Sequence, residues 1–318
     1  IESTILTCLL IVRRSINMNK KHSGYCALCL EYKDKLTFEH IPPRSSGNNS
    51  RAKIDNGQEL VGSNKLPWDF SEMHYENAQQ GAGKYSLCKK CNNKTGRWYG
   101  AAYSQFAQQI KETFETSFSY LIQTGEINIE SVYPLQVIKQ IFSMFCSANP
   151  PTDDHANYKP VVYPFSTQIL TSPIQKLILA QYNLVNAEYW IDDLRKVVLD
   201  KERTGLNYGR FKICMYFTLS PLLKINGISE SLNLNHHDPV SVSEILTYPV
   251  GFLLILNPNN AISYPGIDIT HWADYAYTDC TSISLPLCMY PVNSWIPIDF
   301  RSREEIQKCI EANKSFLG

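Results

Sequence analysis

The chain has 318 residues, of which 44% are hydrophobic and 12% aromatic, so it can bury a core of one large domain or two ordinary ones and is not a disordered protein. Its net charge is zero, but residues 18–99 hold 13 Lys and Arg against 8 Asp and Glu, whereas residues 100–318 hold 15 against 21. Any phosphate contacts are therefore expected near the N-terminus. Ten cysteines are too few for a disulfide scaffold of this size.

The start of the chain has an unusual composition. The first methionine is Met18, and an apolar run from Ile5 to Val12 precedes Arg13 and Arg14. The run is too short to span a membrane, and its basic residues follow it, which is the wrong order for a secretory signal. We expect residues 1–17 to come from an upstream, non-native segment. No other stretch approaches transmembrane length, so we expect a cytoplasmic protein without a membrane segment.

The first half of the chain predicts a strand, a loop and two helices. Leu36–His40 alternates as a strand does and stops before Pro42. Residues 44–64 are rich in Ser, Asn and Gly, which indicates a loop. A helix is expected to open at Asn92 and to continue to Leu121, because apolar residues recur at three- to four-residue spacing. A second helix is expected over Pro134–Ser147.

The second half predicts mixed helices and strands. Asn149–Asp154 contains two prolines and is the expected domain boundary. A helix should follow over Pro173–Asp200. Phe211–Leu219 alternates as in a half-buried strand, and Val250–Leu256 is continuously apolar, as in a buried one. A capping box at Ser302–Glu305 predicts a final helix. The expected fold class is therefore α+β, with a strand-rich C-terminal domain.

Four cysteines fall into two Cys-x-x-Cys pairs, Cys26/Cys29 and Cys88/Cys91. Each two-residue gap forms a tight knuckle that points both sulfurs to one place, and two pairs together supply the four ligands of a tetrahedral zinc ion. A thioredoxin-like redox role would need one pair within a βαβ pattern, which is absent. Four thiolates close the coordination shell, so the predicted Zn²⁺ is structural.

The sequence around these pairs sharpens the hypothesis. Glu39-His40-Ile41-Pro42 follows the first pair, and Asn92 comes directly after Cys91. The combination resembles the HNH endonuclease superfamily, in particular its branch with four cysteines and a ββα-metal core. The resemblance covers about residues 24–103. It implies a zinc-stapled ββα-metal nuclease module, which we place at residues 18–103. The helical pattern and the proline-containing boundary then divide the rest into a helical connector over 104–150 and an α+β domain over 151–318.

The resemblance also implies roles for individual residues. His40 would be the general base that accepts the proton of the attacking water, since imidazole titrates near neutral pH. Glu39 and Asn92 would offer oxygen ligands to a catalytic Mg²⁺ or Mn²⁺. In the family a distorted strand end lets neighbouring residues such as Glu39 and His40 serve one site. Lys94 and Arg97 follow on the predicted helix, whose start also offers backbone N–H groups, and would hold phosphate groups.

The family pattern is not matched throughout. Glu39 stands where the family usually has Asp, and no middle Asn precedes the second cysteine pair, Asn77 being the nearest. A zinc-containing nucleic-acid-binding protein without cleavage activity therefore remains an alternative, as does a structural zinc ribbon in a protein scaffold. The expected partner is DNA. The layout resembles bacterial restriction, anti-phage and mobile-element nucleases, in which a second domain gives specificity or control.

Residues 151–318 resemble no family by sequence and are expected to bind DNA, a protein partner or a signalling ligand. Several histidines outside the pattern favour structural roles. His22 and His74 match no motif, and His236-His237-Asp238 lies in a region rich in Asn and Pro that is typical of a loop. His271-Trp272 begins an aromatic-rich stretch that favours a packed corner over a binding pocket.

Overall fold

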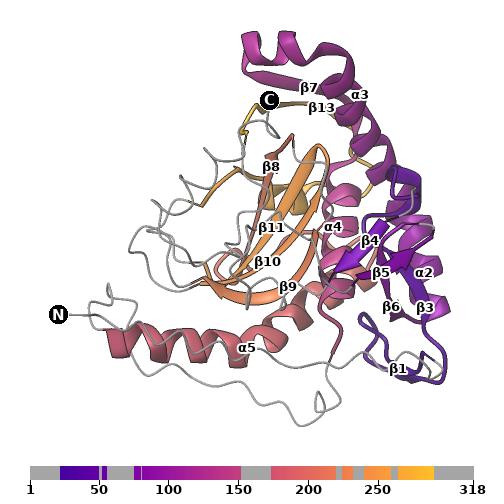
Figure 1. Ribbon diagram of the computed structural model, residues 1–318, viewed down its shortest axis with the longest axis vertical. Helices are drawn as coiled ribbons and strands as arrows, with labels where there is room; N and C mark the ends of the chain where they lie inside the picture. Colours follow the sequence, from indigo (N-terminus) through magenta and orange to yellow (C-terminus); the bar gives the residue numbers. More distant parts are fainter. Residues whose placement is uncertain are drawn as a thin grey trace.

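The structure is a computed structural model that describes residues 22–49, 52–55, 75–79, 81–151, 173–219, 224–231, 240–258 and 264–289. These residues form a mixed α+β fold, which confirms the predicted class. A central antiparallel sheet packs one face against long helices, and a region of short strands from the N-terminal part of the chain lies beyond these helices (Figure 1).

Five antiparallel strands form the central sheet in the order β12-β8-β11-β10-β9. They are β8 (Phe211–Phe217), β9 (Lys224–Ser231), β10 (Val240–Thr247), β11 (Val250–Leu256) and β12 (Ile267–Asp268). The predicted strands at β8 and β11 are confirmed. The prediction that β8 is only half-buried is wrong, because six of its seven residues are buried.

The alternation of β8 instead sorts its side chains between two apolar clusters. Ile213, Met215 and Phe217 belong to the main core, whereas Cys214 and Tyr216 belong to a smaller cluster with residues of β10 and β11. Successive side chains of a strand point to opposite faces, so both faces of this strand are covered. The period-two pattern predicted a solvent face at Cys214 and Tyr216. Cysteine and tyrosine side chains can also pack in an apolar layer, so this face is buried as well.

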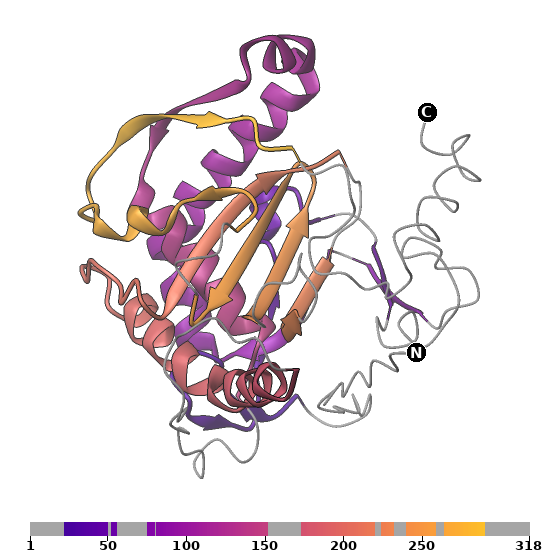
Figure 2. The same ribbon diagram turned by 90° about the vertical axis from the view of Figure 1, so that its left-hand side faces the viewer.

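Two helices were predicted close to their observed bounds, α4 (Pro134–Ala148) and α5 (Pro173–Leu199). Fourteen of the 15 residues of α4 are buried. A helix that is buried on all sides must lie between two layers. It packs against the sheet and α5 on one side and against the N-terminal region on the other. Helix α5 crosses the foot of the sheet (Figures 1 and 2).

The N-terminal region is built from short elements. They are β1 (Gly24–Tyr25), β2 (Tyr32–Lys33), β3 (Thr37–His40), η1 (Arg44–Ser46), β4 (Ala52–Asp55), β5 (Tyr75–Ala78), β6 (Gly83–Leu87) and α2 (Lys89–Thr95). Strand β3 matches its prediction and ends before the prolines. The loop predicted at 44–64 is wrong in part, because it contains η1 and β4. Strand β4 pairs with β5, and its short apolar content gave no clear period-two signal.

The helix predicted from Asn92 starts three residues earlier and is continuous from α2 through a π-helical turn, η2 (Gly96–Gly100), into α3 (Ala101–Thr124). Gly125 ends it with a left-handed φ of 70°, which glycine adopts without strain. The following strand, β7 (Glu126–Val132), pairs with β13 (Thr281–Pro286). A segment near residue 283 therefore returns to the connector region, at the top of Figure 1.

The larger of the two apolar clusters joins the N-terminal region, the long helices and one face of the central sheet. The main cluster of buried apolar residues runs from Cys26 in the N-terminal region to Leu285 in β13. Trp272, in the short helix η4 (Thr270–Asp274), is 1% exposed and meets Phe106 edge-on at 5.6 Å, as the packed-corner hypothesis predicts. The division into residues 18–103, 104–150 and 151–318 stays a prediction, and the described packing crosses both of its boundaries.

Some sequence predictions fall outside the described residues. They concern residues 1–17, His74, His236-His237-Asp238 and the final helix at Ser302–Glu305. Among the helices that the structure describes, none combines the length and the apolar character that crossing a bilayer requires.

Candidate metal centre

The first cysteine pair lies on a hairpin turn between β1 and β2. The backbone N–H of Cys26 donates to the carbonyl oxygen of Glu31 at 3.0 Å, and that of Leu30 donates to the carbonyl oxygen of Cys26 at 3.0 Å. Leu30 takes a left-handed φ of 59°, which closes the turn. These bonds fold the chain back on itself and bring Cys26 and Cys29 to the same side.

The second pair lies where β6 ends and α2 begins. Cys88 is the N-cap of α2, and the backbone N–H of Cys91 donates to its Sγ at 3.5 Å. The backbone N–H of Cys88 donates in turn to Sγ of Cys26 at 3.3 Å. N–H donors directed at sulfur stabilise the thiolate form, which is the form that binds metal.

All four sulfur atoms, those of Cys26, Cys29, Cys88 and Cys91, lie within 4.8 Å of one another. The Sγ atoms of Cys29 and Cys88 are 3.9 Å apart, close to the ~3.8 Å edge of a tetrahedron with Zn–S bonds of about 2.3 Å. The predicted cluster is therefore formed and could hold a structural zinc ion.

The electrostatics of the cluster favour a cation. A hydrogen bond from the Cys91 thiol, together with backbone N–H donors, lowers the pKa of Cys26 to about 4, whereas burial raises the pKa of Cys29 to about 11. One thiolate forms readily in this position, but further thiolates beside it repel one another. A divalent ion at the centre removes that repulsion and allows all four sulfurs to ionise.

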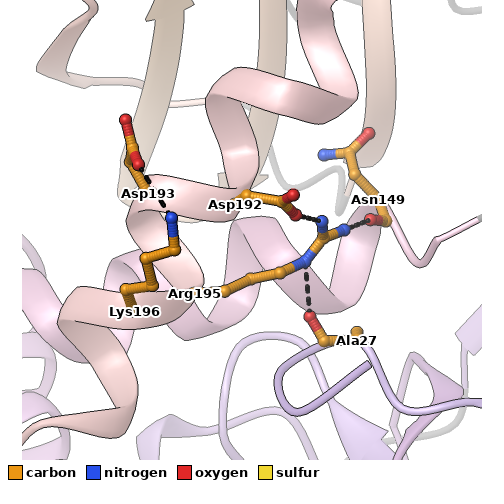
Figure 3. Close-up of polar contacts among 6 residues, drawn as sticks. All are labelled: Ala27, Asn149, Asp192, Asp193, Arg195 and Lys196. Carbon is orange, nitrogen blue, oxygen red and sulfur yellow. Dashed lines mark hydrogen bonds and ion pairs between the residues drawn. The ribbon is translucent and has the colours of Figure 1, made fainter. Parts of the chain in front are cut away.

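Arg195 of α5 holds the first knuckle from outside (Figure 3). Its side chain is 2% exposed, its Nε donates to the carbonyl oxygen of Ala27 at 2.9 Å, and its Nη2 donates to that of Asn149 at 3.3 Å. Nη1 forms an ion pair with Asp192. The backbone N–H of Ala27 donates to the carbonyl oxygen of Ser86 at 2.7 Å, so the knuckle is held by both β6 and α5.

A zinc ion with four thiolates carries a net charge of −2, which is costly to bury without compensation. The guanidinium of Arg195 supplies positive charge next to the knuckle and fixes its backbone, as outer partners of metal ligands do. Sequence reasoning missed Arg195 because 168 residues separate it from Ala27.

The remaining candidate residues lie on β3 and α2. Strand β3 pairs with β6 in antiparallel register, with Phe38 opposite Tyr85, Glu39 opposite Lys84 and His40 opposite Gly83. The ladder shifts register between Thr37 and Phe38, at the far end of β3 from His40. The distorted strand end inferred from the family is therefore not found beside His40.

Glu39 is a buried carboxylate without a hydrogen-bond donor. It is 7% exposed, and burial alone raises its pKa to about 7. Lys84, directly opposite on β6, donates from Nζ to the carbonyl oxygen of Ala148 at 3.0 Å. Within the part of the chain that the structure describes, no side chain or N–H donates to the Glu39 carboxylate. Burial disfavours the charged form of such a group, and a bound cation would stabilise it.

Asn92 is oriented by a hydrogen-bond chain that links α2 to β3. Its Nδ2 donates to Oγ1 of Thr37 at 3.0 Å, and Oγ1 of Thr37 donates to the carbonyl oxygen of Leu87 at 2.8 Å. The Thr37 hydroxyl donates its hydrogen bond to Leu87, so towards Asn92 it can only accept, and its partner there is the amide nitrogen. The amide oxygen of Asn92 is then left for another partner. Thr37 and Glu39 are two residues apart on β3 and therefore share a face of the strand.

His40 lies on the other face by the same alternation. It is half-buried, and its ring meets that of Phe38 edge-on with 5.0 Å between centroids. The structure thus brings the Asn92 side chain to the strand face of Glu39, and places the imidazole of His40 on the face of Phe38.

Two residues that sequence reasoning missed shape the end of β3. A Cβ on Gly83 would come 2.0 Å from the carbonyl oxygen of Glu39, so only glycine fits opposite His40. Asn48 donates from Nδ2 to the carbonyl oxygens of Pro42 and Ala82, and its Oδ1 accepts from the N–H of Ala82. It ties the chain after β3 to the chain before β6. Asn77, the nearest middle Asn by sequence, lies in β5 instead.

The predicted phosphate-binding residues lie beyond Asn92. The ammonium of Lys94 lies over the Trp98 ring at 4.9 Å from its centroid, and Arg97 is exposed. The sequence predicted a free backbone N–H at Asn92, and this prediction is wrong. Helix α2 begins at Lys89, so the N–H of Asn92 donates to the carbonyl oxygen of Cys88. The first turn instead presents the exposed Lys89 and Lys90, which the sequence reading had not singled out.

No family model, curated protein or solved structure matches the chain. The functional conclusion therefore depends on the residues themselves and on their geometry.

Proposed function

We propose that the chain is a zinc-stabilised, metal-dependent endonuclease of HNH type that hydrolyses phosphodiester bonds, with DNA as its substrate. The observation that supports this most is the Glu39 carboxylate, which is 7% exposed and lacks a hydrogen-bond donor among the described residues. It shares a strand face with Thr37, whose hydroxyl leaves the amide oxygen of Asn92 available. Carboxylate and amide oxygens are ligands that Mg²⁺ and Mn²⁺ accept.

The residues then divide the work. Glu39 and Asn92 hold the divalent ion, which when bound neutralises charge on the phosphate and on the leaving oxygen. His40 takes the proton of the attacking water, a role that suits a group titrating near neutral pH. Lys94 and Arg97 hold phosphate groups of the nucleic acid. The four cysteines keep β6 and α2, and hence Asn92, in place. Bacterial restriction or anti-phage defence is the setting that this combination suits.

The test is a plasmid-nicking assay in the presence of Mg²⁺ or Mn²⁺. We expect nicking by the wild-type chain, its loss when the catalytic ion is withheld, and its loss in Asn92→Ala. Asn93→Ala is a matched control, because Asn93 is the next residue of α2 and is exposed. Equal activity of the two variants would remove Asn92 from the site. Absence of nicking by zinc-loaded wild-type protein on any DNA or RNA would refute the proposal.

One observation favours a second candidate, a zinc-containing nucleic-acid-binding protein that does not cut. Glu39 and His40 lie on opposite faces of β3, whereas hydrolysis needs both at one phosphate. Under this reading, the wild-type protein binds nucleic acid and no condition produces nicks. Under the leading proposal, nucleic acid and metal together bring the imidazole and the carboxylate to the same phosphate, and His40→Ala abolishes cleavage.

A further inference from the structure

Four aromatic rings are in contact on the β3–β6 sheet, and we call them the aromatic face: His22, Phe38, His40 and Tyr85. The rings of His22 and Tyr85 are stacked, with 3.4 Å between centroids and 4° between planes. Tyr85 meets Phe38 edge-on at 5.2 Å, and Phe38 meets His40 edge-on at 5.0 Å. The series therefore leads from an exposed ring pair directly to the proposed general base.

The aromatic face is more open to solvent than a folded core requires. Tyr85 is 45% exposed and His22 is exposed. A tyrosine on a strand usually buries its ring against a neighbouring layer, because the ring carries most of its apolar area. Here the outer ring pair remains available to a planar partner.

The composition of the N-terminal part of the chain favours one class of partner. Residues 18–99 hold 13 Lys and Arg against 8 Asp and Glu, so the region attracts polyanions. A partner that is both polyanionic and rich in planar rings is a nucleic acid. In a duplex the faces of the bases are covered by their neighbours, so only unpaired bases can stack on protein side chains.

We propose that the aromatic face binds unpaired bases, so that the preferred substrate is a single strand or a locally unpaired segment next to the cut. The ring of His22, parallel to that of Tyr85, lies in the position that a stacked base takes. Tyr85 and His40 both contact Phe38. A nucleic-acid strand that stacks on the His22–Tyr85 pair therefore lies close to His40. The inference deepens the proposed nuclease function, and its binding step is measured without cleavage.

The experiment measures binding of fluorescein-labelled oligonucleotides of mixed sequence by zinc-loaded protein without added Mg²⁺ or Mn²⁺. Single-stranded DNA, single-stranded RNA and the DNA duplex are compared. We expect the wild type to bind at least one single strand more tightly than the duplex. Tyr85→Ala should weaken single-strand binding by about 5- to 150-fold, the loss produced by removing one base–aromatic stack. Tyr85→Trp should keep it.

The matched control is Tyr120→Ala, which removes a tyrosine that is 60% exposed on α3, outside the aromatic face. It should leave all affinities unchanged. Fluorescence of an oligonucleotide containing 2-aminopurine should be quenched on binding to the wild type and less so by Tyr85→Ala, which separates stacking from phosphate contact.

Equal affinity of the wild type for duplex and both single strands would overturn the inference, as would equal effects of Tyr85→Ala on duplex and single strand. Binding that follows the expected pattern in a protein that nicks nothing would retain the inference and refute the nuclease. Nicking without any single-strand preference would retain the nuclease and refute the inference.

Discussion

Replacing Glu39 by glutamine should stabilise the zinc-loaded protein when no catalytic ion is bound, and should abolish the proposed nuclease activity. Glutamine keeps the size of the side chain and removes its charge. The ordinary pKa of Glu39 is 4.5, and burial raises it to about 7 in the folded protein. Between these pH values the folded protein holds a proton that the unfolded chain releases, so stability falls as the pH rises through this window.

The size of the effect follows from the two pKa values. At about 1.4 kcal/mol per pH unit, ionising Glu39 in the folded protein costs about 3 kcal/mol above pH 7. The glutamine variant lacks this cost. Its free energy of unfolding should exceed that of the wild type by about 1 kcal/mol at pH 5.5 and by about 3 kcal/mol at pH 8. Both proteins contain the same zinc site, so the pH dependence of zinc binding cancels in the comparison.

The assay is urea unfolding of zinc-loaded protein, followed by tryptophan fluorescence between pH 5.5 and pH 8. A second series adds Mg²⁺, which should stabilise the wild type at pH 8 by about 2.7 kcal/mol at a hundred times its dissociation constant and leave Glu39→Gln unchanged. Glu31→Gln, on an exposed acid of the same region, is the control and should follow the wild type across this range. Parallel curves for wild type and Glu39→Gln would show that the carboxylate is solvated or paired, and the reasoning would fail.

Three further changes and one truncation test the rest of the site. His40→Ala should reduce cleavage by about 10²- to 10⁴-fold, and wild-type cutting would exclude His40 as the base. Cys88→Ser should release zinc, measured by elemental analysis, and unfold the N-terminal region. Arg195→Met should weaken zinc retention against a chelator by about 10- to 100-fold, whereas Lys196→Met, on the exposed side of α5, should not. Residues 18–150 alone should melt at a lower temperature than the same region in the full chain, because α4 would lose α5 and the sheet; equal melting would show an independent module.

The sequence was a sufficient guide where a signal is local. The two Cys-x-x-Cys pairs predicted a cluster that the structure forms, because each knuckle depends on a few adjacent residues. The helix over Pro134–Ala148 and the strand over Val250–Leu256 were equally clear, since long periodic or continuously apolar runs leave few alternatives. The α+β class follows from these elements together.

The sequence was a poor guide where the cause is a distant contact. Nothing local marks Asn48 as the residue that joins the ends of β3 and β6, because its partners Pro42 and Ala82 meet only in the folded chain. The requirement for glycine at position 83 also has a distant cause. The carbonyl oxygen of Glu39 approaches Gly83 across the sheet and leaves no room for a side chain. Burial of Glu39 also follows from tertiary packing and changes a surface-like acid into a candidate ligand.

The prolines after Asn149 suggested a boundary, yet the contacts around them join the two sides. The carbonyl oxygens of Asp200 and Lys201, directly after α5, accept hydrogen bonds from Lys139 of α4, while the carbonyl oxygen of Val198 in α5 accepts one from Tyr99 of the π-helical turn at 2.8 Å. Lys139 is fully buried, and burial lowers its pKa to about 8, although the nearby carboxylates of Asp200 and Glu202 favour its charged form. Through Arg195 and Val198, α5 therefore contacts both the zinc knuckle and the π-helical turn of the proposed nuclease region. A ligand that moved α5 would therefore act on the zinc knuckle and on the helix that carries Asn92, which gives the strand-rich part of the chain a direct physical route for control.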